Sequence, residues 1–147
     1  SQRHFVLRYN QDMGYEILGH TADLRIKVWG KDQVELFSEA LRALMDILKP
    51  NLSSLRVKRI RKVKVQSQDS ATLIVDFLNE ALALAQTQRV VYKRISFQKI
   101  SEKELEGELE GTPVLGFEQD VKAVTYHEVQ IKKNVRGDLE TNLVMDI

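Results

Sequence analysis

Two runs of alternating residues near the C-terminus constrain the fold more than any other feature of the sequence. Within the span 121–131, the odd-numbered residues are Val, Ala, Thr, His, Val and Ile. From 139 to 147, a second set of apolar residues also falls at odd-numbered positions. A short polar connection that contains Gly137 separates the two runs. Such a pattern is typical of an antiparallel hairpin.

The hairpin brings particular residues together. If its turn is centred near residues 135 and 136, Asp146 lies beside Thr125, within about two residues. Ile147, Lys122 and Tyr126 then belong to the same neighbourhood as Asp146.

Two helices and several further strands are predicted upstream. Residues 24–29 alternate between apolar and basic side chains, which indicates a half-buried strand. Asp32, followed by Glu35 three residues later, forms a capping-box pattern at the start of a helix. The apolar residues of that helix recur at helical spacing and are Val34, Phe37, Leu41, Leu44 and Leu48.

A second helix is predicted from about residue 71 to residue 85. Apolar side chains cover most of its circumference, so we expect it to be buried on two sides. Strands are expected over 57–65, 90–99 and 105–109. The predicted fold class is α+β, with mostly antiparallel β-sheets and two α-helices.

Composition limits the classes of protein that fit. The chain has 147 residues, of which 43% are hydrophobic and 29% charged, and this balance supports one sizeable core. The 22 basic residues are nearly balanced by 21 acidic ones. Non-specific nucleic-acid binding, which usually requires an excess of basic residues, is therefore not expected as the main task. The absence of cysteine excludes disulfides, zinc–thiolate sites and cysteine nucleophiles. No linker divides the sequence, so we predict one domain over 14–147, preceded by a tail or an extra strand over 1–13.

Four segments of the sequence resemble one family in the same order along the chain. The segment 15–23 reads Tyr-Glu-Ile-Leu-Gly-His-Thr-Ala-Asp and resembles the opening of the archease family. Residues 75–84 resemble its central helix, and 121–127, Val-Lys-Ala-Val-Thr-Tyr-His, resemble its penultimate strand. The final Met-Asp-Ile of 145–147 is similar to the ending of that family.

The resemblance implies a cytoplasmic accessory protein that is not itself an enzyme. Its implied partner is the RtcB-type tRNA-splicing RNA ligase, whose guanylylation and multiple turnover it would promote, with tRNA as an indirect partner and no membrane involved. The resemblance also implies a divalent metal ion held by Asp23, Asp146 and Ile147. Calcium is the ion that the family suggests, with magnesium and manganese as alternatives.

The chemistry of these three residues suits a hard cation. Calcium takes roughly 6–8 oxygen ligands. Asp23 and Asp146 have the polar parity of their strands, and Ile147, as the last residue, adds a main-chain carboxylate. Because three residues supply few ligands, we expect an open site at which the partner or water completes the coordination.

Four further residues are candidates for contact with the partner or for support of the metal. His20 is expected to orient the loop of Asp23, and Lys122 to lie near the terminal carboxylate. Tyr126 belongs to the same predicted neighbourhood. His127 shares the parity of Val121, so we expect it to point toward the core.

A basic segment offers a different function. Six cations fall within nine residues and are candidates for contact with RNA or with the ligase: Arg56, Lys58, Arg59, Arg61, Lys62 and Lys64. A solvated edge strand explains them as well, and the acidic period-two run over 102–110 is expected to flank it. The alternative function is therefore an RNA-binding module or chaperone-like adaptor in RNA processing. A small metal-dependent hydrolase is a third hypothesis, although the sequence has no Gly-rich phosphate loop and no Gly-x-Ser-x-Gly elbow.

Overall fold

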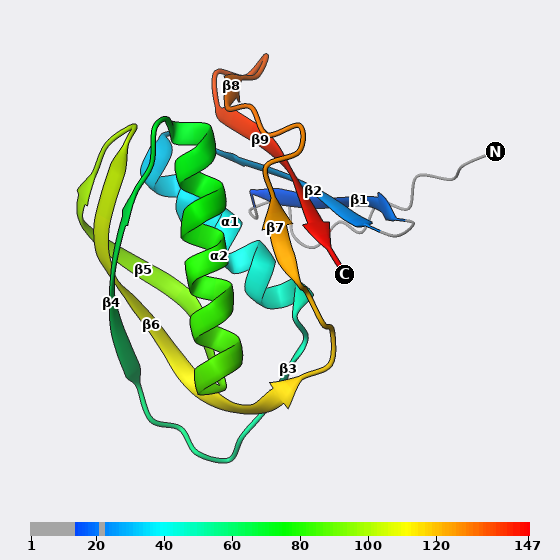
Figure 1. Cartoon of the computed structure of the whole chain (residues 1–147), viewed down its shortest axis with the longest axis vertical. Helices are drawn as coiled ribbons and strands as arrows, with labels where there is room; N and C mark the ends of the chain where they lie inside the picture. Colours follow the sequence, from blue (N-terminus) through cyan, green and yellow to red (C-terminus); the bar gives the residue numbers. More distant parts are fainter. Residues whose placement is uncertain (1–13, 21–22) are drawn as a thin grey trace.

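The alternating segment Asp23–Gly30 forms β2, at the centre of the first sheet (Figure 1). It lies between β1 (Tyr15–His20) and β9 (Leu139–Asp146), and β9 also pairs with β7 (Ala123–Thr125) and β8 (Lys132–Lys133). Each of these pairings is antiparallel. The computed structural model describes residues 14–20 and 23–147. The tail or extra strand predicted for 1–13 lies outside the described residues.

The second sheet is built around the long strand β6 (Glu104–Phe117). One edge of β6 pairs with β4 (Arg59–Gln66) and, near its end, with β3 (Pro50–Leu52), while the other edge pairs with β5 (Val90–Ile100). Because β4 has no partner on its other side among the described strands, its predicted role as a basic edge strand is confirmed.

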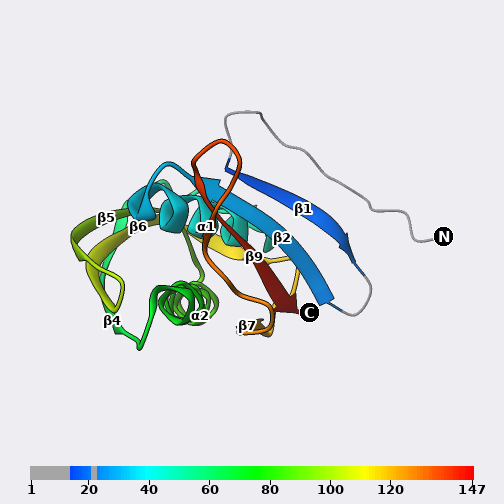
Figure 2. The same ribbon diagram turned by 90° about the horizontal axis from the view of Figure 1, so that it is seen from above.

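Two helices hold the sheets together. The helix α1 (Gln33–Ile47) packs on β2 and on β5, so it lies between the sheets (Figure 2). The helix α2 (Ser70–Gln88) packs on α1 and contacts β4, β5 and β7. Burial on two sides, predicted from its apolar circumference, is therefore confirmed. Neither helix of the described residues has the combination of length and hydropathy that crossing a bilayer requires.

The predicted fold class is confirmed, with differences in detail. Asp32 caps α1 as expected, since its side chain accepts a hydrogen bond from the Glu35 amide at 2.9 Å. Val34 is 45% exposed, however, and does not belong to the core stripe of α1. The strands β1 and β3 were not predicted, because their short segments show no sustained alternation.

The C-terminal hairpin pairs as predicted, but its first strand is shorter. Asp146 lies opposite Ala123, within two residues of the predicted partner Thr125. The strand β7 ends at Thr125 and pairing resumes only at Lys132, so the continuous strand predicted over 121–131 is wrong. Within β7 the even-numbered Val124 is buried, opposite Met145. Directly paired residues share a face of the sheet, so the pairing, and not the apolar parity, decides which side chains face inward.

Candidate metal centre

Asp23 and Asp146 are direct partners across neighbouring strands. The register of β2 against β9 places Asp23 opposite Asp146, and Asp146 lies opposite Ala123 of β7 on its other side. Directly opposed residues of an antiparallel pair have Cβ atoms about 4.5–5.5 Å apart, on the same face of the sheet. The two carboxylates therefore lie close together, although 123 positions of the sequence separate the start of β2 from the end of β9.

The face that carries the two aspartates is the outer face of the first sheet. The next residues along each strand, Leu24, Met145 and Val124, are buried in the core. Asp23 is half-buried and Asp146 is exposed. The buried neighbours fix the strand ends, so that both carboxylates are held in position while one side remains open to solvent.

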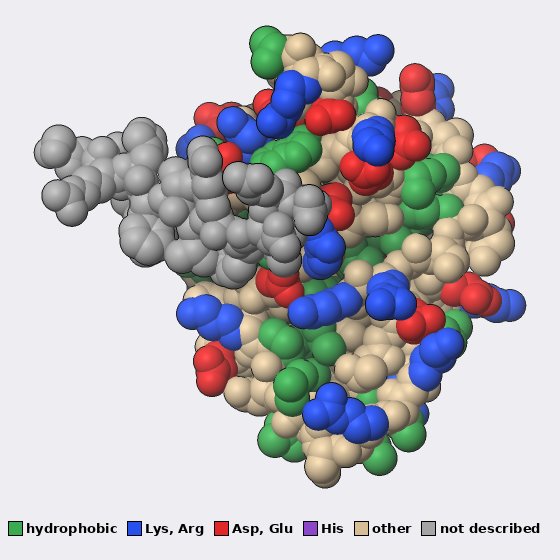
Figure 3. All heavy atoms as spheres, turned by 180° about the vertical axis from the view of Figure 1, so that it is seen from behind, with side chains coloured by type: hydrophobic (Ala, Val, Ile, Leu, Met, Phe, Trp, Pro, Cys, Tyr) green, Lys and Arg blue, Asp and Glu red, His purple; other side chains and the backbone are tan. Residues whose placement is uncertain are grey.

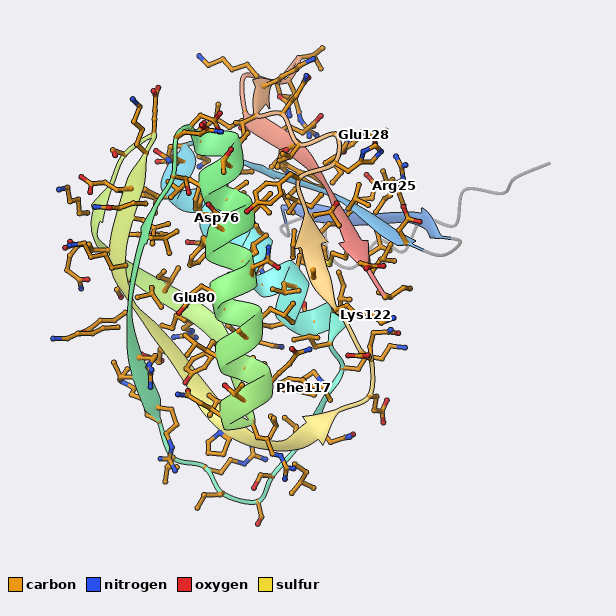
Figure 4. The ribbon with its side chains drawn as sticks, in the orientation of Figure 1. Arg25, Asp76, Glu80, Phe117, Lys122 and Glu128 are labelled. Carbon is orange, nitrogen blue, oxygen red and sulfur yellow. The ribbon has the colours of Figure 1, made fainter. Side chains whose placement is uncertain are left out.

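Lys122 and Ile147 join the same neighbourhood, as predicted. The backbone N–H of Lys122 donates a hydrogen bond of 2.7 Å to the carbonyl oxygen of Asp146. The Ile147 side chain packs partly against the core, which fixes the residue that follows Asp146. Figure 4 shows Lys122 on the segment that leads into β7, beside the end of β9.

The donors present fit a hard divalent cation. Two opposed carboxylates and the neighbouring main-chain oxygens of residue 147 are oxygen ligands, the type that calcium, magnesium and manganese prefer. In the described part of the chain, no three His, Cys, Asp or Glu side chains are arranged to hold a metal ion. The side chains of Asp23 and Asp146 supply at most four of the roughly 6–8 oxygens of a calcium shell, so a complete site needs further oxygens.

The segment containing Lys122 is held in place by α2. The amide of Asn79 donates to the carbonyl oxygen of Val124 and accepts from its N–H, both at 2.8 Å. Gln86 donates to the Val121 carbonyl oxygen at 3.0 Å. The side chain of Asn79 thus completes the hydrogen bonds of Val124 at the free edge of β7. Together with Gln86 it sets the position of Lys122 relative to Asp146.

Replacing Asn79 with Ala is expected to leave both backbone groups of Val124 without partners. Each unsatisfied and partly buried group costs about 1–3 kcal/mol, so we expect a loss of about 2 kcal/mol or more in the free energy of unfolding. Urea denaturation measures this loss. Glu80→Ala, at the exposed neighbouring position of α2, is the control and should change stability by less than about 0.5 kcal/mol.

Tyr126, predicted to belong to this neighbourhood, makes its side-chain hydrogen bond to α2. The Tyr126 hydroxyl donates to Asp76 of α2, and this hydrogen bond raises the pKa of Tyr126. Asp76 also accepts from the Ser67 hydroxyl at 2.5 Å, so it links the segment after β7 to the segment before α2. Of His20 only the backbone is described, at the end of β1, and the role predicted for its side chain lies outside the described residues.

The inward orientation predicted for His127 is wrong. Its side chain is exposed and lies 3.5 Å from a carboxylate oxygen of Glu128. The alternating pattern ends with β7, and Glu128 has a positive φ of 59° in the turn that follows. The parity of the sequence therefore does not continue through this segment.

An ion pair between this turn and β2 was not predicted from the sequence. Arg25 and Glu128 lie 2.5 Å apart, and Figure 4 shows their side chains together beyond β9. Arg25 is two residues from Asp23 on the same outer face. The two residues of the pair are 103 positions apart and follow no motif, so only the pairing of β2, β9 and β7 could have revealed it.

The six predicted basic residues divide into two groups. Lys62 and Lys64 lie opposite Glu108 and Glu106 of β6, and Lys64 pairs with Glu106 at 3.3 Å. The acidic run thus flanks the basic strand, as expected. Of the remaining four, Arg56 and Lys58 precede β4, and Arg59 and Arg61 lie within its first three residues.

The arrangement of two sheets and two helices is found in proteins of known structure. The solution structure of Methanobacterium thermoautotrophicum protein 1598 matches with a TM-score of 0.70 at 25% identity, covering 92% of this chain and 99% of that one. A crystal structure from Thermotoga maritima, described as an archease and possible chaperone, matches with a TM-score of 0.64 at 22% identity and shares the fold.

Sequence comparison identifies the family. The model of the Archease protein family matches residues 15–147. Protein archease of Methanosarcina barkeri is 30% identical over 146 residues, covering 94% of this chain and 99% of the relative. Protein archease of Pyrococcus abyssi is 30% identical over 142 residues, covering 90% and 98%. The chain belongs to the archease family.

Proposed function

We propose that this chain is a metal-dependent activator of an RtcB-type tRNA-splicing RNA ligase in the cytoplasm. In this proposal it promotes guanylylation and multiple turnover of the ligase and has no substrate of its own. The observation that carries the proposal is the direct pairing of Asp23 with Asp146 across β2 and β9, in a member of the archease family.

The metal proposed here would be held by Asp23, Asp146 and a main-chain oxygen of Ile147. Two like charges directly opposite each other in a sheet destabilise it, and a divalent cation removes this repulsion. We propose calcium, with magnesium and manganese as alternatives. The bound ion supplies positive charge and vacant coordination positions that oxygens of a partner can fill.

The chain's own residues would orient this site toward the ligase. The buried Leu24 and Met145 keep the two carboxylates at fixed positions on the outer face. The Lys122 amide holds the backbone of Asp146, and the Lys122 side chain is exposed at the same end of the sheet. In this arrangement the ammonium of Lys122 provides a second cationic contact for an acidic or phosphate group on the partner.

The test is ligase guanylylation across a titration of calcium, magnesium and manganese. Asp23→Asn and Asp146→Asn each remove one negative ligand and keep the shape of the side chain. We expect both variants to lower stimulation by on the order of tenfold or more, the size of effect that loss of support at a metal site produces. Excess metal should restore part of the activity.

The matched control is Asp120→Asn, at an exposed position just before β7. It makes the same change of charge outside the proposed ligand set and should stimulate the ligase like the wild type. Wild-type stimulation by Asp23→Asn or Asp146→Asn would rule out the proposed metal role.

A second candidate function is an RNA-binding module or chaperone-like adaptor that uses the basic segment 56–64. The observation that favours it is the cluster of cations at the start of β4, all of them exposed. Salt-dependent tRNA binding by the isolated protein, without any stimulation of the ligase, would favour this function over the first.

A further inference from the structure

The outer face of the second sheet carries two grooves of similar size and different charge. The first, of about 440 Å³, is lined on its two sides by four cations and contains one carboxylate, that of Glu110. We call it the basic groove, and its cations are Arg56, Lys58, Lys93 and Arg94. The second, of about 480 Å³, is lined by Lys62 and Lys64 together with Glu106 and Glu108, so its charges balance.

Two guanidinium groups of the basic groove are available to a ligand. Lys58 pairs with Glu110 at 3.4 Å, and Lys93 pairs with Asp46 of α1 at 2.8 Å. Among the residues that the structure describes, the side chains of Arg56 and Arg94 form no ion pair or hydrogen bond. Both are exposed, one in the segment before β4 and the other on β5.

The base of the basic groove is formed by closely packed backbone, because β5 and β6 approach each other at a glycine. Gly111 of β6 is buried, and a Cβ atom there would lie 2.2 Å from the carbonyl oxygen of Val91, so only glycine allows this close approach of β5. Thr112 adds an exposed hydroxyl. The lining includes no aromatic side chain on which a base could stack.

We propose that the basic groove binds the phosphate groups of an RNA backbone, with Arg56 and Arg94 as the main contacts. Arginine forms paired hydrogen bonds to phosphate oxygens in a fixed planar geometry. Because stacking platforms are absent, recognition depends on charge and shape and not on base sequence. The choice of RNA over other phosphate polymers rests on the proposed function in RNA ligation.

This proposal divides the six cations of 56–64, which the sequence offers as one group of candidates for contact with RNA or with the ligase. Lys62 and Lys64 lie opposite Glu108 and Glu106 of β6, and Lys64 pairs with Glu106. Arg94 lies opposite Glu110, whose ion pair is with Lys58, and it was not among the predicted residues because it lies on a different strand. Figure 3 shows Lys and Arg side chains beside hydrophobic ones at the lower end of the back of the molecule, where the chain connects β3 to β4. The carboxylate pair lies on the other sheet, so one molecule can hold both sites.

The test compares two pairs of substitutions on the same sheet. Binding of a fluorescein-labelled tRNA transcript to the full chain is followed by anisotropy between about 50 and 200 mM salt. We expect R56Q/R94Q to weaken binding by about tenfold at the lower salt and to reduce the slope of log affinity against log salt by about 2. K62Q/K64Q removes the same charge and should weaken binding less than about twofold, because two glutamates balance the two lysines of the second groove.

Several outcomes would overturn the assignment. They are equal losses in both double variants, no loss in R56Q/R94Q, and no binding of tRNA by the wild type at low salt. Thermal unfolding of both variants confirms that they fold.

A separate arm distinguishes this site from the metal centre and from a ligase contact. Asp23→Asn should bind the transcript like the wild type, so failure of either proposal leaves the other testable. R56Q/R94Q should retain full stimulation of ligase guanylylation in the absence of RNA. Loss of that stimulation with tRNA binding intact would assign the groove to the ligase and overturn the proposal.

Discussion

Replacing Phe77 with Ala is expected to lower the free energy of unfolding by about 3–5 kcal/mol, as for other fully buried aromatic residues. Phe77 lies on α2 and is fully buried. Its ring stacks on Phe37 of α1 at 5.8 Å between centroids and lies 6.3 Å from Phe97 of β5. The side chain thus joins both helices to the second sheet, and its loss leaves a cavity that three rigid elements cannot close.

Urea denaturation measures this effect, with an unchanged m-value showing that the same surface is exposed on unfolding. Val34→Ala is the control, because Val34 lies on α1 but is 45% exposed, and a change within about 0.5 kcal/mol is expected there. A loss below about 1 kcal/mol in Phe77→Ala would contradict the description of this core.

Replacing Asp146 with Lys is expected to separate stability from function. The new ammonium lies directly opposite Asp23, so two like charges become a cross-strand pair of opposite charges, which contributes roughly 0.2–1 kcal/mol. We therefore expect the protein without metal to be as stable as the wild type or slightly more stable. Stimulation of the ligase is expected to fall to the unstimulated level, because a lysine cannot bind a cation.

Thermal unfolding in the presence of a chelator and ligase guanylylation measure the two effects on one sample. Asp120→Lys makes the same reversal of charge at an exposed position and should preserve stimulation. If Asp146→Lys stimulates the ligase like the wild type, the proposed metal site has no part in activation.

The sequence predicts much of this arrangement, because alternation and apolar stripes reflect burial directly. The positions of β2, both helices and β9 follow from these patterns. The approach of Lys122 to Asp146 follows from hairpin pairing alone, since a turn near residue 136 determines which residues face each other.

The errors arise where tertiary contacts decide the structure. Alternation suggested that His127 continues a strand, but the chain turns away after Thr125, and Arg25 holds the turn through Glu128. The basic groove could not be predicted either. It combines the segment just before β4 with one on β5, and only the pairing of β4 and β5 with the same strand, β6, brings them together.

The most direct test of the central claim is the location of a bound cation in the isolated protein. Manganese, one of the proposed ions, is paramagnetic and broadens the amide NMR signals of nearby residues. At substoichiometric Mn²⁺ we expect the signals of Asp23, Leu24, Lys122, Asp146 and Ile147 to broaden first, and Asp146→Asn to remove the effect. Broadening centred instead on the glutamates of β6, or no selective broadening at all, would contradict the assignment of a metal site to the ends of β2 and β9.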